Sequence, residues 1–96
     1  MPGFQIEYKK EKIKPGGWIG MNANAAEELN IPFHHRSRKV IEIWRTSHPV
    51  MRATEKHEEI EYYLMNKGMN YHEAHKVALK YENSKKPIID ILGEVL

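Results

Sequence analysis

The sequence of 96 residues contains no cysteine. Disulfide bonds and thiolate metal sites are therefore excluded, and any metal ligands must be histidine imidazoles or carboxylates. No apolar run approaches the roughly 18–20 residues that a membrane-spanning helix needs. The first five residues, Met-Pro-Gly-Phe-Gln, lack the apolar core of a signal peptide. We therefore expect an intracellular, cytoplasmic protein with no membrane partner.

Strong charge of either sign is also missing. The net charge is +2, and the pI of 8.8 lies below the value of about 9 that is typical of a dedicated nucleic-acid binder. Residues 1–48 hold eight Lys and Arg against five Asp and Glu, whereas residues 49–96 hold seven against eight. The overall charge thus leaves nucleic acid open as a partner without indicating it. Chains of this length rarely divide, so we expect residues 1–96 to form a single domain.

Several segments have the pattern of strands. Residues 4–9 alternate apolar and polar side chains, which is typical of a half-buried strand. Residues 39–45 are rich in β-branched and aromatic residues and form the best strand in the chain. Residues 18–21 can form a short second strand, and residues 88–92 fit either a terminal strand or a short helix.

Three helices are expected, over about residues 25–29, 48–67 and 71–82. Asn24 and Glu27 approximate a capping box for the first helix, and Gly68 is suited to end the second. The order of elements predicts an α+β fold, in which a small antiparallel sheet of three or four strands packs against a two-helix hairpin.

The second helix carries charged residues on its apolar side. At 100° per residue, one sector roughly 100° wide includes both His57 and Glu61. The same sector holds Val50, Ala53, Ile60 and Leu64. We therefore expect His57 and Glu61 to point toward the interior of the protein and not into solvent.

His57 and Glu61 are four residues apart, so both side chains can reach one cation from the same helix face. A third ligand must come from elsewhere, and His75 on the next helix is the natural candidate. The alternative is a purely structural role, in which His57 is a hydrogen-bonded core histidine and the neighbouring glutamates are solvated or paired with Lys or Arg.

The run His57-Glu58-Glu59-Ile60-Glu61 reads His-Glu-x-x-Glu, and it follows a strand. Residues 39–82 thereby resemble a reduced zincin core, similar to the minigluzincin metallopeptidases. The resemblance implies zinc as cofactor, His57 and Glu61 as ligands, Glu58 as general base and a peptide as substrate. The second histidine of the zincin motif is replaced by Glu61. The added negative charge weakens the metal as a Lewis acid, so the resemblance implies a metal-binding domain that is either a peptidase or a degenerate or inactive form of one.

A basic strip offers a different function. Arg36, Arg38, Lys39 and Arg45 can contact phosphates and make the chain a non-catalytic module that binds nucleic acid or an acidic protein. Small proteins of microbial viruses and mobile elements are similar in size and composition. The alternative is an inert, solvated loop. Tyr62 or Tyr63 can mark the contact of a homodimer, because tyrosine is enriched in interfaces.

Overall fold

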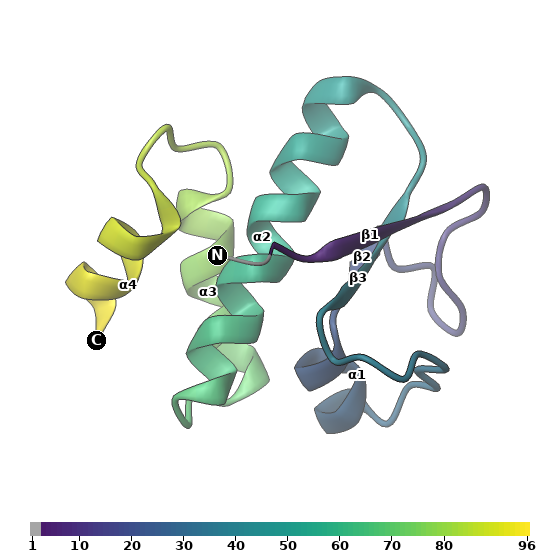
Figure 1. Ribbon diagram of the computed structural model, residues 1–96, viewed down its shortest axis with the longest axis horizontal. Coiled ribbons are helices and arrows are strands. Elements are labelled where there is room, and N and C mark those ends of the chain that lie inside the picture. The colour runs from purple at the N-terminus through teal and green to yellow at the C-terminus, as the bar shows by residue number, and fades with distance from the viewer. Residues whose placement is uncertain (1–2) are drawn as a thin grey trace.

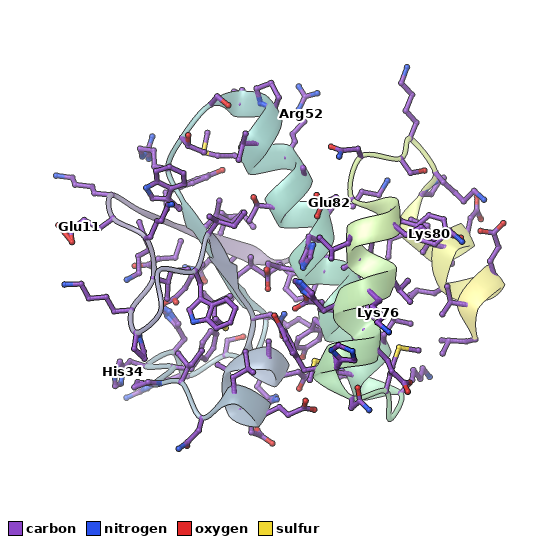
Figure 2. All side chains as sticks on the ribbon, turned by 180° about the vertical axis from the view of Figure 1, so that it is seen from behind. Glu11, His34, Arg52, Lys76, Lys80 and Glu82 are labelled. Atoms are coloured by element: carbon purple, nitrogen blue, oxygen red, sulfur yellow. The ribbon has the colours of Figure 1, made fainter. Side chains whose placement is uncertain are left out.

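The computed structural model describes residues 3–96; Met1 and Pro2, where no signal-peptide core was expected, lie outside the described residues. Within this range the elements are β1 (Gln5–Lys9), β2 (Gly20–Met21), α1 (Ala23–Leu29), β3 (Val40–Trp44), α2 (His48–Asn66), α3 (Tyr71–Tyr81) and α4 (Ile88–Val95). The sheet lies on one side of α2, and α3 and α4 lie on the other (Figure 1). Figure 2 shows the same arrangement from behind, with the side chains. The predicted α+β class is confirmed.

The sheet has three strands in the order β1-β3-β2. β1 runs parallel to β3, and β2 runs antiparallel to it. The prediction of a purely antiparallel sheet is therefore wrong, because the sheet is mixed. Parallel pairing needs a long crossover connection, which residues 10–39 provide with β2 and α1 inside it. The alternation of apolar and polar residues is the same for either strand direction, so the sequence pattern does not reveal this arrangement.

The helices share a core on the side of α2 that faces away from the sheet. Its side chains have no exposed surface and come from α2, α3 and α4: Ile60, Leu64, Ala74, Ala78 and Ile91. The segment after Pro87, which fits either a strand or a helix by its sequence, is the helix α4. Its Ile91 enters this core. This close-packed core fixes α2 and α3 relative to each other. It therefore also fixes the relative positions of the side chains that both helices direct toward the sheet.

A second core lies between α1 and the loops around it, and includes Met21, Ala26 and Ile31. The helix α1 begins at Ala23, because Asn22 and not Asn24 is its N-cap. The Asn22 side-chain oxygen accepts a hydrogen bond of 2.9 Å from the Ala25 N–H. The predicted cap was therefore misplaced by two residues, and the correct cap brings a buried amide to the end of β2.

Tyr62 packs within the chain. Its ring meets that of Phe4 edge to face with centroids 5.1 Å apart, and Tyr63 contacts the same ring at 5.7 Å. These contacts account for the tyrosine pair without a partner, and a homodimer stays a prediction. None of the helices in residues 3–96 is long and apolar enough to cross a membrane.

Candidate metal centre

The helix α2 buries three polar side chains of the predicted motif. His57, Glu58 and Glu61 retain 7%, 5% and 1% of their exposure. Acidic residues are almost never buried this fully unless they are paired or bind a metal. The four-residue spacing directs His57 and Glu61 to one side of the helix, as expected. Their burial shows that the site lies inside the protein and not on a solvated helix face.

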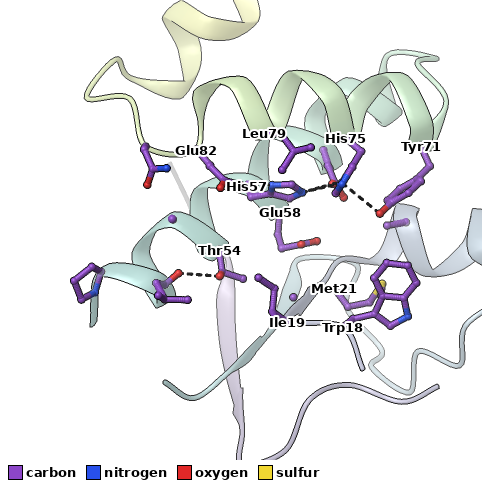
Figure 3. Close-up of a pocket in the computed structure, with 17 residues that line it drawn as sticks. Trp18, Ile19, Met21, Thr54, His57, Glu58, Tyr71, His75, Leu79 and Glu82 are labelled. Carbon is purple, nitrogen blue, oxygen red and sulfur yellow. Dashed lines mark hydrogen bonds and ion pairs between the residues drawn. The ribbon is translucent and has the colours of Figure 1, made fainter. Parts of the chain in front are cut away.

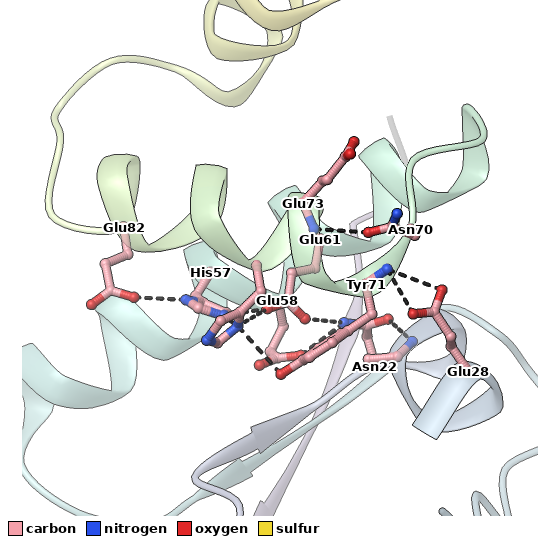
Figure 4. A network of polar contacts seen from close by, with 11 residues as sticks. Asn22, Glu28, His57, Glu58, Glu61, Asn70, Tyr71, Glu73 and Glu82 are labelled. Atoms are coloured by element: carbon pink, nitrogen blue, oxygen red, sulfur yellow. Dashed lines mark hydrogen bonds and ion pairs between the residues drawn. The ribbon is translucent and has the colours of Figure 1, made fainter. Parts of the chain in front are cut away.

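His57 and Glu61 converge with His75 of α3. The Nδ1 atom of His75 lies 2.7 Å from Glu61 Oε2 and 3.1 Å from His57 Nε2, and His57 Nε2 also contacts Glu61 Oε2. His75 is labelled beside His57 in Figure 3, and Glu61 is labelled beside His57 in Figure 4. The structure thus brings together the three ligands expected from the sequence, with one donor atom from each within 4.8 Å of the others. Tetrahedral zinc with bonds of about 2.0–2.1 Å spaces its ligand atoms about 3.3 Å apart. The three atoms need only small side-chain movements to admit the ion.

Each candidate ligand on α2 has a second hydrogen-bond partner outside the triad. Glu82 Oε1 lies 2.7 Å from His57 Nδ1, so a proton on Nδ1 leaves the Nε2 lone pair free for a metal. Asn22 Nδ2 donates to Glu61 Oε1 at 3.2 Å. Sequence reasoning missed both partners. The sequence spacing could have indicated Glu82, because it follows His75 by seven residues and therefore lies on the same helix face. Asn22 lies outside both helices, and no spacing in the sequence indicates it.

The electrostatics of the site are dominated by its buried carboxylates. Burial lowers the pKa of His57, but the hydrogen bond to Glu61 and the charges of Glu61 and Glu58 outweigh this and raise the pKa to about 9. Burial and the nearby charge of Glu61 raise the pKa of Glu58 to about 8. Below a pH of about 9, His57 therefore carries a proton on both ring nitrogens, and a metal ion bound at Nε2 must displace the proton there.

Glu58 and Tyr71 stand beside the three ligand atoms without joining them. Glu58 Oε1 accepts a hydrogen bond of 2.8 Å from Asn22. The Tyr71 hydroxyl lies 3.3 Å from His75 Nδ1, and the two rings are stacked. Burial, together with the charges of Glu61, Glu58 and Glu28, raises the pKa of Tyr71 to about 12, so its hydroxyl keeps its proton.

A pocket of about 390 Å³ opens beside this cluster (Figure 3). The ligand triad, Glu58 and Tyr71 all line it, and the remaining wall is mainly apolar. The edge strand β2 contributes Gly20 and Met21. An apolar pocket with a few convergent polar groups is the usual form of a small-molecule or active site.

No known protein family, curated protein or solved structure matches this chain. The candidate metal centre is therefore supported by its residues and their geometry alone.

Gly20 allows α2 to approach the sheet closely. A Cβ atom at this position would lie 2.5 Å from Thr54 Cγ2 and 2.8 Å from Glu58 Oε2. Gly20 pairs with Ile43 on β3, so the face of the sheet that carries Ile43 is the one that α2 covers. Sequence reasoning gave Gly20 no role, because the approach involves a helix more than thirty residues away.

Gly20→Ala is expected to lower the free energy of unfolding by about 1–3 kcal/mol, because the added methyl group overfills a packed contact. Gly93→Ala in α4 is the matched control, since a Cβ there meets no atom within 4 Å. It should stabilise the protein by about 0.5–1 kcal/mol, because glycine is unfavourable inside a helix. Urea denaturation of both variants measures the difference. Equal midpoints would contradict the close approach of α2 to β2.

The residues of the basic strip lie on the surface. Arg38 is engaged by Glu27 and Asn24. Lys39 lies over the ring of Phe4 at one end of β3, and Arg45 lies over that of Tyr8 at the other. Nucleic-acid binding by this strip, including the exposed Arg36, stays a prediction that none of these contacts favours.

Proposed function

We propose that this chain is a zincin-like domain that binds one zinc ion through His57, Glu61 and His75 and hydrolyses peptides. The observation that carries the proposal is the convergence of three donor atoms from two helices at one wall of a pocket. A structural histidine needs one hydrogen-bond partner on each ring nitrogen. Here one donor atom from each of two imidazoles and one carboxylate converges on the same small region. Asn22 holds the carboxylate of Glu61 in place, and Glu82 holds the imidazole of His57.

The donor set favours zinc. Two imidazoles and one carboxylate are the protein ligands of several zinc hydrolases, which leave a further position for water or substrate. The glutamate in place of the motif's second histidine supplies the carboxylate, and His75 supplies the second imidazole. The total ligand charge therefore equals that of a zinc site with two histidines and a glutamate. The loss of Lewis acidity expected from the motif alone is offset by the identity of the third ligand.

Zinc bound here would polarise a carbonyl oxygen and lower the pKa of water. Glu58 lines the pocket beside the triad. The positive charge of a bound zinc ion would lower the raised pKa of Glu58, so that its carboxylate could accept the proton of an attacking water. The protonated hydroxyl of Tyr71 can donate to an oxygen that develops negative charge next to His75. β2 is an edge strand that lines the same pocket, and an extended peptide can pair with such an edge.

Cobalt substitution tests the ligand set. Cobalt(II) added to the metal-free protein should give the intense visible absorption of a four- or five-coordinate site and saturate at one ion per chain. Glu61→Gln and His57→Ala should lose this spectrum, because each removes a ligand. His72→Ala is the matched control, since His72 is exposed on the same helix as His75. A spectrum that remains that of hydrated cobalt in the wild-type protein would refute the proposal.

A further inference from the structure

The mouth of the pocket gathers exposed apolar side chains. Ile19, Val50 and Leu79 retain 47%, 40% and 53% of their exposure, and all three line the pocket. Within residues 3–96 the other large exposed apolar side chains are Tyr8, Ile89 and Leu96. A single exposed apolar residue is ordinary on a protein surface, but three around one pocket indicate a binding site.

These three residues come from separate elements that also supply the polar site. Leu79 follows His75 by one helical turn on α3, and Ile19 precedes β2 (Figure 3). Val50 precedes His57 by two turns on α2. The sequence pattern places Val50 on the buried stripe of its helix, yet the structure leaves it at the pocket mouth. An exposed position for Val50 is explained if a ligand completes its burial.

Apolar and charged side chains line different parts of the pocket wall. Thr54 Oγ1 bonds to the Val50 carbonyl at 2.8 Å, and the Thr54 methyl group faces β2. Met21 and Ala25 continue the apolar wall, whereas the carboxylates of Glu58, Glu61 and Glu82 lie together on the side of the triad. An acidic ligand side chain is therefore disfavoured by like charge, and an apolar one gains from burial.

We propose that the pocket selects peptides by a bulky apolar side chain, of leucine or phenylalanine size, placed against Ile19, Val50 and Leu79. This rests on the proposed function for the reaction, but the apolar contact itself does not require the metal. A pocket of about 390 Å³ is large enough for such a side chain with its adjoining peptide group.

The test compares acetohydroxamate with hexanohydroxamate on the zinc-loaded protein by calorimetry. Both probes carry the same chelating head, and the second adds four methylene groups. Each buried methylene tightens binding about fourfold, so hexanohydroxamate should bind on the order of 100-fold more tightly. Leu79→Ser should reduce this ratio about tenfold, and Leu79→Met should restore most of it. Ile89→Ser is the control, because Ile89 is 77% exposed and does not line the pocket.

A second arm separates this inference from zinc binding. Hexanamide lacks the chelating head, and its binding to metal-free Trp44→Phe protein can be followed by the fluorescence of Trp18, which lines the pocket. Saturable binding that Leu79→Ser weakens and Ile89→Ser does not would support the apolar site, even if zinc fails to bind. The inference would be overturned by equal affinity for the two hydroxamates or by the absence of hexanamide binding. It would also be overturned if Leu79→Ser left the ratio of the two hydroxamate affinities unchanged.

Discussion

Zinc added to the metal-free protein is expected to raise its melting temperature by about 10–20 °C when free zinc exceeds its dissociation constant 100-fold. The ligands are assembled only in the folded chain, because His57 and Glu61 lie on α2 and His75 lies on α3. Zinc therefore stabilises the folded state over the unfolded one. The positive charge of zinc also offsets the repulsion between the buried carboxylates of Glu61 and Glu58. Differential scanning calorimetry with and without zinc measures the shift.

Two variants decide whether this shift comes from the proposed site. Glu61→Gln keeps the size of the side chain but removes its charge, and it should lose most of the shift. His72→Ala removes an exposed histidine and should keep it. An equal shift in both variants would show that zinc binds elsewhere.

Glu58→Gln is expected to lower peptide hydrolysis by about 10²- to 10⁴-fold, because it removes the proposed general base. The glutamine amide oxygen can still accept the hydrogen bond from Asn22, so the fold should be retained. Zinc uptake should also be unchanged, because Glu58 is not among the three ligands. Turnover of a fluorogenic peptide with leucine on both sides of the scissile bond, together with the zinc content, measures both effects.

The control for this prediction is Glu59→Gln. Glu59 is the next residue of α2, is only half-buried and does not line the pocket, so its turnover should match that of the wild-type protein. A Glu58→Gln variant with undiminished turnover would contradict the assignment of the base. A Glu58→Gln variant that loses its zinc would show instead that Glu58 is a ligand.

The part of the site that follows from local geometry could be predicted from the sequence. Residues four apart on a helix share a face whatever the tertiary fold, so the pairing of His57 with Glu61 required only that α2 be helical. His75 could be chosen because helices joined by a short turn lie antiparallel and adjacent. The apolar stripe placed both α2 ligands inside the protein, which the structure bears out.

The parts set by tertiary packing could not be predicted in this way. Asn22 meets Glu58 across 36 positions of sequence, and its capping role depended on the start of α1. The parallel direction of β1 depends on how residues 10–39 cross over the sheet, which strand periodicity does not encode. The same applies to Gly20, whose close contact with α2 appears only when β2 is placed beside that helix.

The zinc content of the purified, untagged protein tests the metal centre most directly, and elemental mass spectrometry measures it before and after incubation with zinc. We expect about one zinc ion per wild-type chain, and loss of that ion in both His57→Ala and Glu61→Ala. His72→Ala should retain it. A wild-type protein that is free of metal and stays so after incubation with zinc would contradict the metal centre.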